Sequence, residues 1–178
     1  MKKVMMVVLG IFLVSGIVYQ AQAADVTYSV KVQVVSVSAD WTTLFSTPTC
    51  NAGSKFNIYG ASISVQNTGN VNEDFILSCA NSGSWNVTSS TPGANNEFRL
   101  MALFNSIEPS SVDYDVNLDT MTTTSLTASV TRYAGDQSGN NVPQNETRGV
   151  WVSFCAPTET PVGTEQSITI TIDAQSTP

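Results

Sequence analysis

The sequence predicts an all-β protein, an antiparallel two-sheet sandwich of eight or nine strands. Apolar and polar residues alternate in many short runs, and clusters of Gly, Pro, Asn and Asp separate these runs. No stretch repeats its apolar residues at helical spacing, so no amphipathic helix is expected. An up-and-down barrel is the alternative architecture, because alternation reveals one buried face per strand but not whether the sheet closes.

The N-terminus has the pattern of a cleavable secretory signal. Lys2 and Lys3 precede an apolar run over residues 4–18, and the small-residue pattern Ala21-Gln22-Ala23 follows. A retained membrane anchor is the weaker interpretation, because glycine and serine interrupt a run that is shorter than the roughly 20 residues of a membrane span. We therefore expect a signal peptide over residues 1–23, no membrane span after its cleavage, and a secreted, periplasmic or cell-surface protein of a prokaryote.

The remaining chain, residues 24–178, has the length of one β-sandwich domain. Removing the signal takes two of the seven Lys and Arg residues and none of the fourteen Asp and Glu residues, which leaves a formal net charge of −9. Such an acidic chain cannot neutralise phosphates and is repelled by anionic lipid. Nucleic acid is therefore excluded as an expected partner.

The N-terminal half begins with a long expected strand at residues 25–38, in which valines alternate with polar residues. A turn-rich loop at 40–57 separates it from a strand at 62–66. The turn at 67–70, Asn-Thr-Gly-Asn, then joins this strand to one at 73–79 as a β-hairpin. These residue types favour the positive φ angles and side-chain-to-backbone bonds of a tight reversal.

The C-terminal half contains the expected centre of the core. Residues 98–104 are apolar on both faces, which is typical of a strand covered on both sides. The other expected strands lie at residues 84–88, 112–119, 126–131, 148–155 and 167–174. A long exposed loop is expected at residues 134–147, because it is rich in Gly, Asn and Asp.

A resemblance to a known class of module adds to this interpretation. The run from Ser64 to Val71, continuing through Phe75 and Leu77 to Trp85, resembles the N-x-G-N hairpin of immunoglobulin-like modules of the CARDB and NEW3 type. The last part of the chain is similar to the closing hairpin of such modules. The resemblance implies an immunoglobulin-like sandwich from a secreted or cell-surface prokaryotic protein, where the module serves as a spacer or a binding domain.

Three cysteines in a secreted chain favour one disulfide and one remaining thiol. If strand 73–79 runs antiparallel beside strand 148–155, Cys79 and Cys155 lie roughly 20 Å apart. A disulfide allows only about 7 Å between Cα atoms. We therefore expect a Cys50–Cys79 disulfide. Cys155 is then a free or intermolecular thiol that faces outward, with burial under a loop as the equal alternative.

The composition argues against catalysis. The chain has no histidine, and it contains no nucleophile elbow, phosphate-binding loop or Cys-x-x-Cys pair. Paired carboxylates could still form a glycosidase, but a domain of this size leaves little chain for a substrate cleft. We therefore predict no enzymatic activity and no cofactor.

One acidic segment begins like a calcium-binding loop. Its oxygen-bearing side chains occupy alternate positions: Asp113, Asp115, Asn117 and Asp119. Leu118 stands where the loop requires Gly, and Thr124 stands where it requires the bidentate Glu. The segment is therefore interpreted as the acidic outer face of a strand, with calcium as the weaker hypothesis.

Two noncatalytic functions are the main hypotheses. A small secreted hydrolase is kept as a third, because the sequence does not exclude a pair of catalytic carboxylates. The first is a noncatalytic structural protein that assembles into a filament or coat, with a second copy or another surface protein as its partner. Strands 25–38 and 167–174 would pair with a neighbour's edge. The second is a carbohydrate-binding or adhesive module that binds a glycan through Trp151 and loop 134–147, since Trp151 lies on the face opposite Val150 and Val152.

Overall fold

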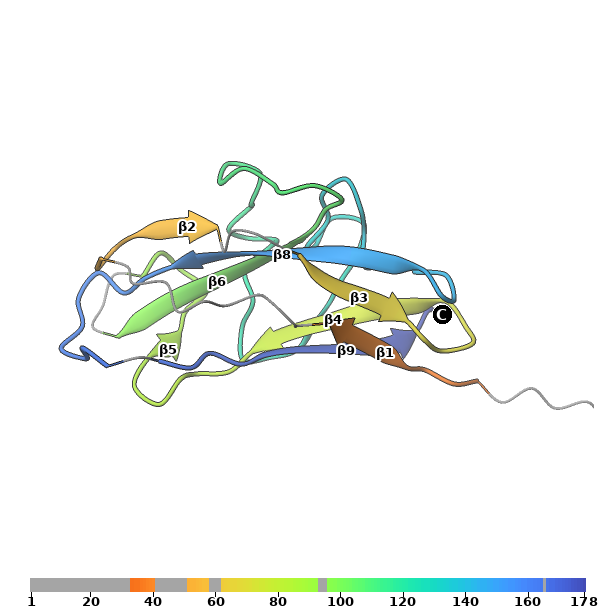
Figure 1. Ribbon diagram of the computed structural model, residues 1–178, viewed down its shortest axis with the longest axis horizontal. Helices are drawn as coiled ribbons and strands as arrows, with labels where there is room; N and C mark the ends of the chain where they lie inside the picture. Colours follow the sequence, from red (N-terminus) through yellow and green to blue (C-terminus); the bar gives the residue numbers. More distant parts are fainter. Residues whose placement is uncertain (1–32, 41–50, 58–61, 93–95, 165) are drawn as a thin grey trace, which may run out of the picture. The chain divides into compact units, whose positions relative to one another are not determined.

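Two β-sheets form the described part of the chain and confirm the predicted all-β, two-sheet sandwich (Figure 1). A computed structural model describes residues 33–40, 51–57, 62–92, 96–164 and 166–178. These residues belong to one unit, Gln33–Pro178, and contain nine strands and no helix.

The larger sheet has six strands in the order β1-β3-β8-β6-β5, with β2 also paired to β8. Its strands are β1 (Val37–Asp40), β2 (Lys55–Asn57), β3 (Ile63–Asn67), β5 (Asn86–Val87), β6 (Glu97–Phe104) and β8 (Thr147–Cys155). The smaller sheet has the order β7-β4-β9 and contains β4 (Glu73–Cys79), β7 (Leu126–Thr127) and β9 (Ile170–Ser176). The neighbouring strands are antiparallel, except that β5 runs parallel to β6.

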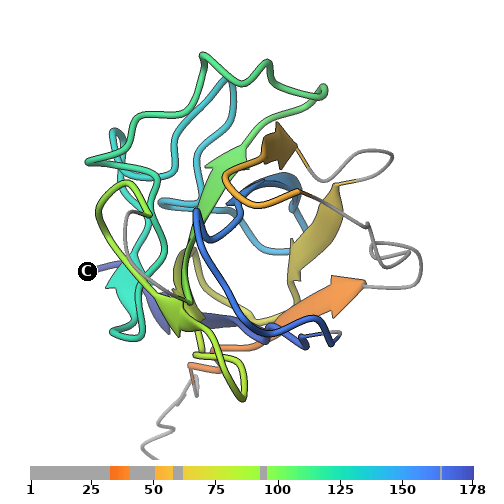
Figure 2. The same cartoon turned by 90° about the vertical axis from the view of Figure 1, so that its left-hand side faces the viewer.

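The hydrophobic core lies between the sheets, and the end-on view in Figure 2 shows the strands arranged around it. As predicted for residues 98–104, β6 is buried on both faces. Its core side chains are Phe98, Leu100, Ala102 and Phe104. On its other face, Met101 and Leu103 pack with Tyr114 in a second small cluster. A strand covered on both sides needs an almost continuously apolar sequence, and β6 has one.

The turn at residues 67–70 connects the two sheets, so the predicted hairpin is wrong. β3 belongs to the larger sheet and β4 to the smaller one. Thr68 N donates to Ser36 O at 2.8 Å and Asn70 N donates to Val34 O at 3.0 Å. The chain that follows β3 therefore continues to pair with the segment before β1 instead of folding back on β3. None of these four described residues has the expected positive φ angle.

Gly69 is required in this turn because of a close approach. A Cβ atom at this position would overlap the Oε1 atom of Glu73 and the carbonyl oxygen of Val34. We expect Gly69→Ala to lower the free energy of unfolding by about 1–3 kcal/mol, as overpacking does elsewhere. Urea denaturation measures this loss.

Gly83→Ala is the matched control, because a Cβ there has no neighbour within 4 Å. Its effect should stay within about 0.5 kcal/mol, as for an ordinary surface substitution. Equal effects of the two substitutions would contradict the steric role of Gly69.

The expected strand at residues 112–119 is a series of turns, despite its strict alternation. Asp113 Oδ2 accepts a hydrogen bond from Ser110 N at 2.7 Å, and Asp115 Oδ1 accepts one from Asn117 N at 2.7 Å. Short acidic side chains that capture neighbouring backbone N–H groups stabilise turns at the expense of strands. Local capture of this kind explains why the alternation here does not produce a strand.

Other elements differ from expectation mainly in length. The strand predicted at 25–38 is observed only from Val37, and residues 25–32 lie outside the described part. Residues 126–131 contribute only the short β7. The loop at 134–147 was expected to be exposed, but Val142 within it is fully buried. Its carbonyl accepts a hydrogen bond from Asn67 Nδ2 at 2.8 Å, so the loop packs against the sandwich.

Candidate functional site

β9 is an edge strand with one open side. Among the described strands it pairs with β4 alone, and Ala80 N donates to Thr169 O while Thr177 N donates to Asn72 O. Antiparallel pairing alternates, so the odd-numbered residues of this stretch bond to β4 and the even-numbered ones point away. The backbone groups that point away belong to Ile170, Ile172, Ala174 and Ser176, and we call them the β9 edge.

One N–H of the β9 edge has a partner. Ala174 N donates to the Oδ1 atom of Asp173 at 2.8 Å. Within the residues that the structure describes, no hydrogen bond is found to the backbone N–H of Ile170, Ile172 or Ser176. Natural edge strands often carry a charged residue that discourages pairing with other chains. Asp173 protects one position in this way and leaves the others open.

The side chains of β9 alternate between two environments. Ile170 is buried, and Ile172 and Ala174 are half-buried against the core. Thr171 and Asp173 are exposed. The strand therefore presents an apolar inner face and a polar outer face, and an added strand with the same alternation would extend both faces.

A second open strand lies close to β9. In the described part of the chain, β1 pairs only with β3, and Cα atoms of β1 and β9 approach within 8 Å of each other. Thr68 N donates to Ser36 O, so the backbone groups of Val37 and Ala39 point away from β3. The two sheets thus end side by side in β1 and β9, each of which pairs with a single strand among those that the structure describes (Figure 1).

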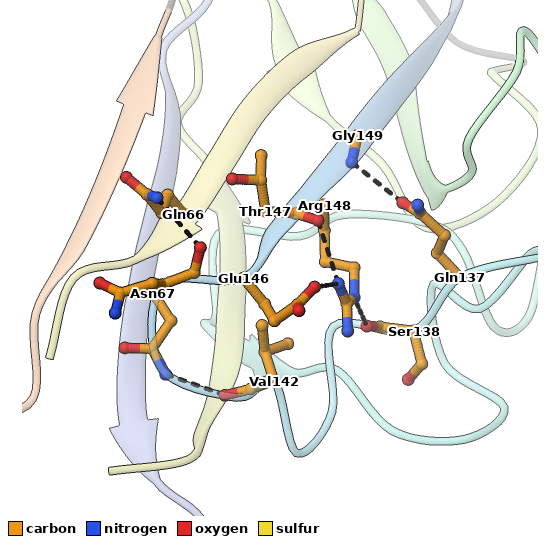
Figure 3. A network of polar contacts seen from close by, with 10 residues as sticks. Gln66, Asn67, Gln137, Ser138, Val142, Glu146, Thr147, Arg148 and Gly149 are labelled. Carbon is orange, nitrogen blue, oxygen red and sulfur yellow. Dashed lines mark hydrogen bonds and ion pairs between the residues drawn. The ribbon is translucent and has the colours of Figure 1, made fainter. Parts of the chain in front are cut away.

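A buried polar network holds this side of the sandwich together. Asn67 is fully buried at the end of β3, and its Nδ2 atom donates to the carbonyls of Val71 and Val142, both at 2.8 Å. Its Oδ1 atom accepts from Gly69 N at 2.9 Å. Figure 3 shows Asn67 reaching the Val142 carbonyl. One side chain therefore joins β3, the turn and the loop before β8.

Glu73 fixes the segment that precedes β1. Its side chain is fully buried, and its Oε1 atom accepts a hydrogen bond from Ser36 N at 2.8 Å. Its Oε2 atom has no hydrogen-bond partner within the described ranges. A buried carboxylate is costly unless it is bonded. Glu73 thus ties residues 34–36 to the start of β4, next to the β9 edge.

Asp74 connects one end of the smaller sheet, where β4 begins and β9 ends, to the neighbouring loop. Its Oδ1 atom accepts from Asn141 N and from Asn140 Nδ2, both at 2.7 Å, and from Thr177 Oγ1 at 3.1 Å. Thr177 directly follows β9, so this carboxylate helps to hold the end of β9 against β4. Charge-assisted bonds of this kind are the stronger hydrogen bonds.

Arg148 fastens the same loop to β8 (Figure 3). Its Nε atom donates to Ser138 O at 3.2 Å, and its Nη1 atom donates to Thr147 O at 3.0 Å. Nη1 also forms an ion pair with Glu146 at 3.2 Å. The Glu146 side chain is 57% exposed, so the pair contributes no more than about 1 kcal/mol.

The side-chain-to-backbone bonds expected of Asn67 in the turn are confirmed, but the sequence interpretation missed its interior position and the role of Glu73, although a signal was present. Asn67 continues the inward phase of Ile63 and Val65, and Glu73 precedes Phe75 in the inward phase of β4. When a polar residue occupies a core-facing position of a strand, its side chain is expected to be hydrogen-bonded in the interior. Both residues are bonded, and both hold the open side in place.

The two described cysteines are free and buried. Cys79 faces the core, and burial raises the pKa of its thiol to about 12. β4 and β8 lie in different sheets, so the antiparallel pairing from which the Cys50–Cys79 disulfide was inferred is wrong. Cys50 lies outside the described residues, and its pairing stays a prediction.

Cys155 does not face solvent, so the outward orientation considered above is wrong. It is 3% exposed and lies in register with the buried Arg99 on β6. The segment after Cys50 runs beside it, since Gly53 N donates to Pro157 O at 2.8 Å and Ala156 N donates to Ser54 O at 2.8 Å. An intermolecular bond from Cys155 would require this end of β8 to open.

Trp151 lies on the outer face of β8, but its indole is already engaged. Its Nε1 atom donates to Asn105 O at 3.0 Å, and the side chain is half-buried. Val150 and Val152 point into the core, as the alternation predicted. The loop at 134–147, the other part of the expected glycan site, packs against the sandwich through Val142.

The acidic segment separates into exposed turn residues and one buried carboxylate. Asp113, Asp115 and Asn117 are exposed, whereas Asp119 is 3% exposed. Asp119 accepts hydrogen bonds from Asp115 N at 2.7 Å and from Tyr133 N at 3.1 Å. Burial raises the pKa of Asp119 to about 6, despite the opposing effect of these two bonds.

The described ranges contain no group of three or more His, Cys, Asp or Glu side chains that could hold a metal ion. They also contain no helix with the length and apolar character needed to span a bilayer.

The described residues thus form an all-β sandwich in which β9 pairs with β4 alone. Comparisons with known protein families, curated proteins and solved structures give no match to this chain. The resemblance to CARDB and NEW3 modules therefore stays a prediction.

Proposed function

We propose that this protein is a noncatalytic structural subunit that associates with further copies through its strand edges, outside the cell or on its surface. The β9 edge is the observation that carries the proposal. Free N–H and C=O groups on an edge strand are a template for pairing with another chain, and the long, half-apolar β9 retains such groups.

The location in the proposal comes from the sequence. The signal-peptide pattern over residues 1–23 favours export, and the chain lacks histidine and the motifs of the common enzyme classes. The acidic net charge keeps separate copies soluble until a specific contact forms. These features suit a secreted component of a filament or coat.

The described residues give less support to the glycan-binding alternative than to assembly. A sugar platform requires an accessible aromatic face and a loop that is free to contact the ligand. Trp151 is half-buried and bonded to Asn105, and loop 134–147 is held by Arg148 and Asn67. Assembly is therefore the function that the described residues support better.

Sedimentation and light scattering on residues 24–178 test the proposal. We expect association that increases with protein concentration and that is about tenfold or more weaker in Ala174→Pro. Proline at this position removes an outward-pointing N–H and adds a ring to the open edge, without removing a bond to β4. Ala174→Ser is the matched control, since it keeps the N–H and should associate like the wild-type chain.

A wild-type chain that stays monomeric near 1 mM, where even a millimolar Kd is detectable, would contradict the proposal. Unfolding midpoints of both variants should be measured in parallel, so that a loss of folding is recognised as such.

A further inference from the structure

We infer that the β9 edge of one copy receives residues 24–32 of a second copy as an added β-strand. This inference rests on the proposed function and specifies its contact. The acceptor consists of the outward-pointing backbone groups of Ile170, Ile172, Ala174 and Ser176. The donor is the part of the expected mature chain that precedes the first described residue, Gln33.

The lengths of donor and acceptor agree. β9 runs from Ile170 to Ser176 and is about 23 Å long at about 3.3 Å per residue. Residues 24–32 extend to about 30 Å at the same rise. The donor can therefore follow β9 along its whole length.

The side-chain patterns agree as well. Val26, Tyr28, Val30 and Val32 alternate with Thr27, Ser29 and Lys31 in the donor. β9 has the same alternation, with Ile172 and Ala174 against the core and Thr171 and Asp173 outside. A strand paired in register would place its apolar side chains beside the core and its polar ones in solvent.

The donor starts at the correct place in the fold. Val34 and Ser36 are held by the turn after β3 and by Glu73, on the side where β1 approaches β9. The first described residues, which the donor directly precedes in the sequence, therefore lie close to β9. Two copies that meet on this side can exchange donors, or one copy can extend to the next.

Charge does not oppose this donor. Residues 24–32 carry one acidic residue, Asp25, and one basic residue, Lys31, and are neutral, whereas the expected mature chain has a net charge of −9. Asp173 lies on the exposed face of β9, where the polar face of the donor would lie. Opposite charges on neighbouring strands stabilise the pair, and like charges oppose it.

A complementation experiment on residues 24–178 tests the inference. The donor-blocked variant carries Tyr28→Pro and Ser29→Pro, which remove one N–H on each side of the donor strand whichever way it runs, and the acceptor-blocked variant carries Ala174→Pro. Each variant alone should associate at least tenfold more weakly than the wild-type chain, because proline interrupts strand pairing. An equimolar mixture should form a 1:1 dimer without longer species, since only one functional donor and one functional acceptor remain.

The possible failures are distinguishable. A wild-type chain that does not associate overturns both the proposed function and this inference. A wild-type chain that associates while the donor-blocked variant associates equally well overturns the inference alone. Association that is lost in Ala39→Pro but kept in Ala174→Pro would place the contact on β1 and also overturn the inference. Tyr28→Phe with Ser29→Thr is the matched control and should behave like wild type.

Discussion

Asn67→Ala should destabilise the protein by about 3–5 kcal/mol. The substitution removes three side-chain hydrogen bonds and leaves the carbonyl of Val71 and the N–H of Gly69 without these partners, while the carbonyl of Val142 keeps its bond from Glu73 N. Each buried polar group that loses its partner costs about 1–3 kcal/mol. Urea denaturation should show a lower midpoint with an unchanged m-value.

Asn72→Ala is the matched control, because it changes the same residue type in the same connection. Asn72 Nδ2 makes a single exposed hydrogen bond to Asn141 Oδ1 at 2.9 Å. Its loss should cost less than about 1 kcal/mol. Asn67→Asp adds a second comparison: it keeps the acceptor for Gly69 N but cannot donate to the two carbonyls, so it should be as damaging as Asn67→Ala. An Asn67→Ala protein within about 1 kcal/mol of wild type would refute the role of this network.

The second large effect concerns pH and Asp119. Its pKa in the folded protein is raised to about 6, first by burial and then by the charge of Asp115, against the two backbone bonds and the charge of Arg132. In the unfolded chain an Asp titrates near 3.9. The folded state therefore binds this proton more tightly, and its stabilising contribution is fully present below about pH 4.

This contribution should be lost as the pH rises through about 6. A difference of about two between the folded and unfolded pKa values corresponds to at most about 3 kcal/mol. In Asp119→Asn the titration is absent, so the stability difference between wild type and variant should change by up to this amount between pH 4 and 7. Carbon-13 NMR of the carboxyl group measures the titration directly. A midpoint below 4 for Asp119 would contradict the expectation.

Asp119→Asn also has an effect that does not depend on pH. The amide offers one oxygen where the carboxylate offers two, and two backbone N–H groups require an acceptor. One of them loses its bond, at a cost of about 1–3 kcal/mol. Tyr133 is then less firmly held at its positive φ of 58°, an uncommon conformation for an aromatic residue.

Strands could be predicted from the sequence where alternation reflects burial. The strands expected at residues 62–66, 73–79, 148–155 and 98–104 correspond closely to β3, β4, β8 and β6. In these stretches one or both faces are buried, so the apolar positions are set by the core. Burial of one or both faces produces both the alternation and the packing, so the predicted strands match the observed ones.

Alternation failed where it has another cause. Val112 is 87% exposed, and the acidic residues that follow bind backbone N–H groups of their own turn. Pairing between strands could not be predicted either. The connection at residues 67–70 has the composition of a hairpin turn, but Val34 and Ser36 bond to it from a distant segment. Such non-local partners are not visible in a local pattern.

The open edge could be predicted only in part. The alternation at residues 167–174 indicates a strand, and the hypothesis that this strand pairs with a neighbour follows from its composition. Its edge position depends on sheet order, which places β9 beside β4 with no further described strand beyond it. The polar residues that hold this side, Asn67 and Glu73, looked like breaks in the apolar phase. The bonds from Asn67 to Val142 and from Ser36 to Glu73 join residues that are far apart in the sequence.

The connection between the sheets also determines when the fold can form. The chain passes from the larger sheet to the smaller one between β3 and β4, early in the sequence. The partner of β4 is made much later, since Glu73 pairs with Ser176 and Cys79 pairs with Ile170. Contacts with such high contact order are slow to form, because a long loop must close before they contribute. A chain emerging from the ribosome cannot complete its smaller sheet until β9 has been made. Until then β4 remains without β9, its neighbour in the smaller sheet.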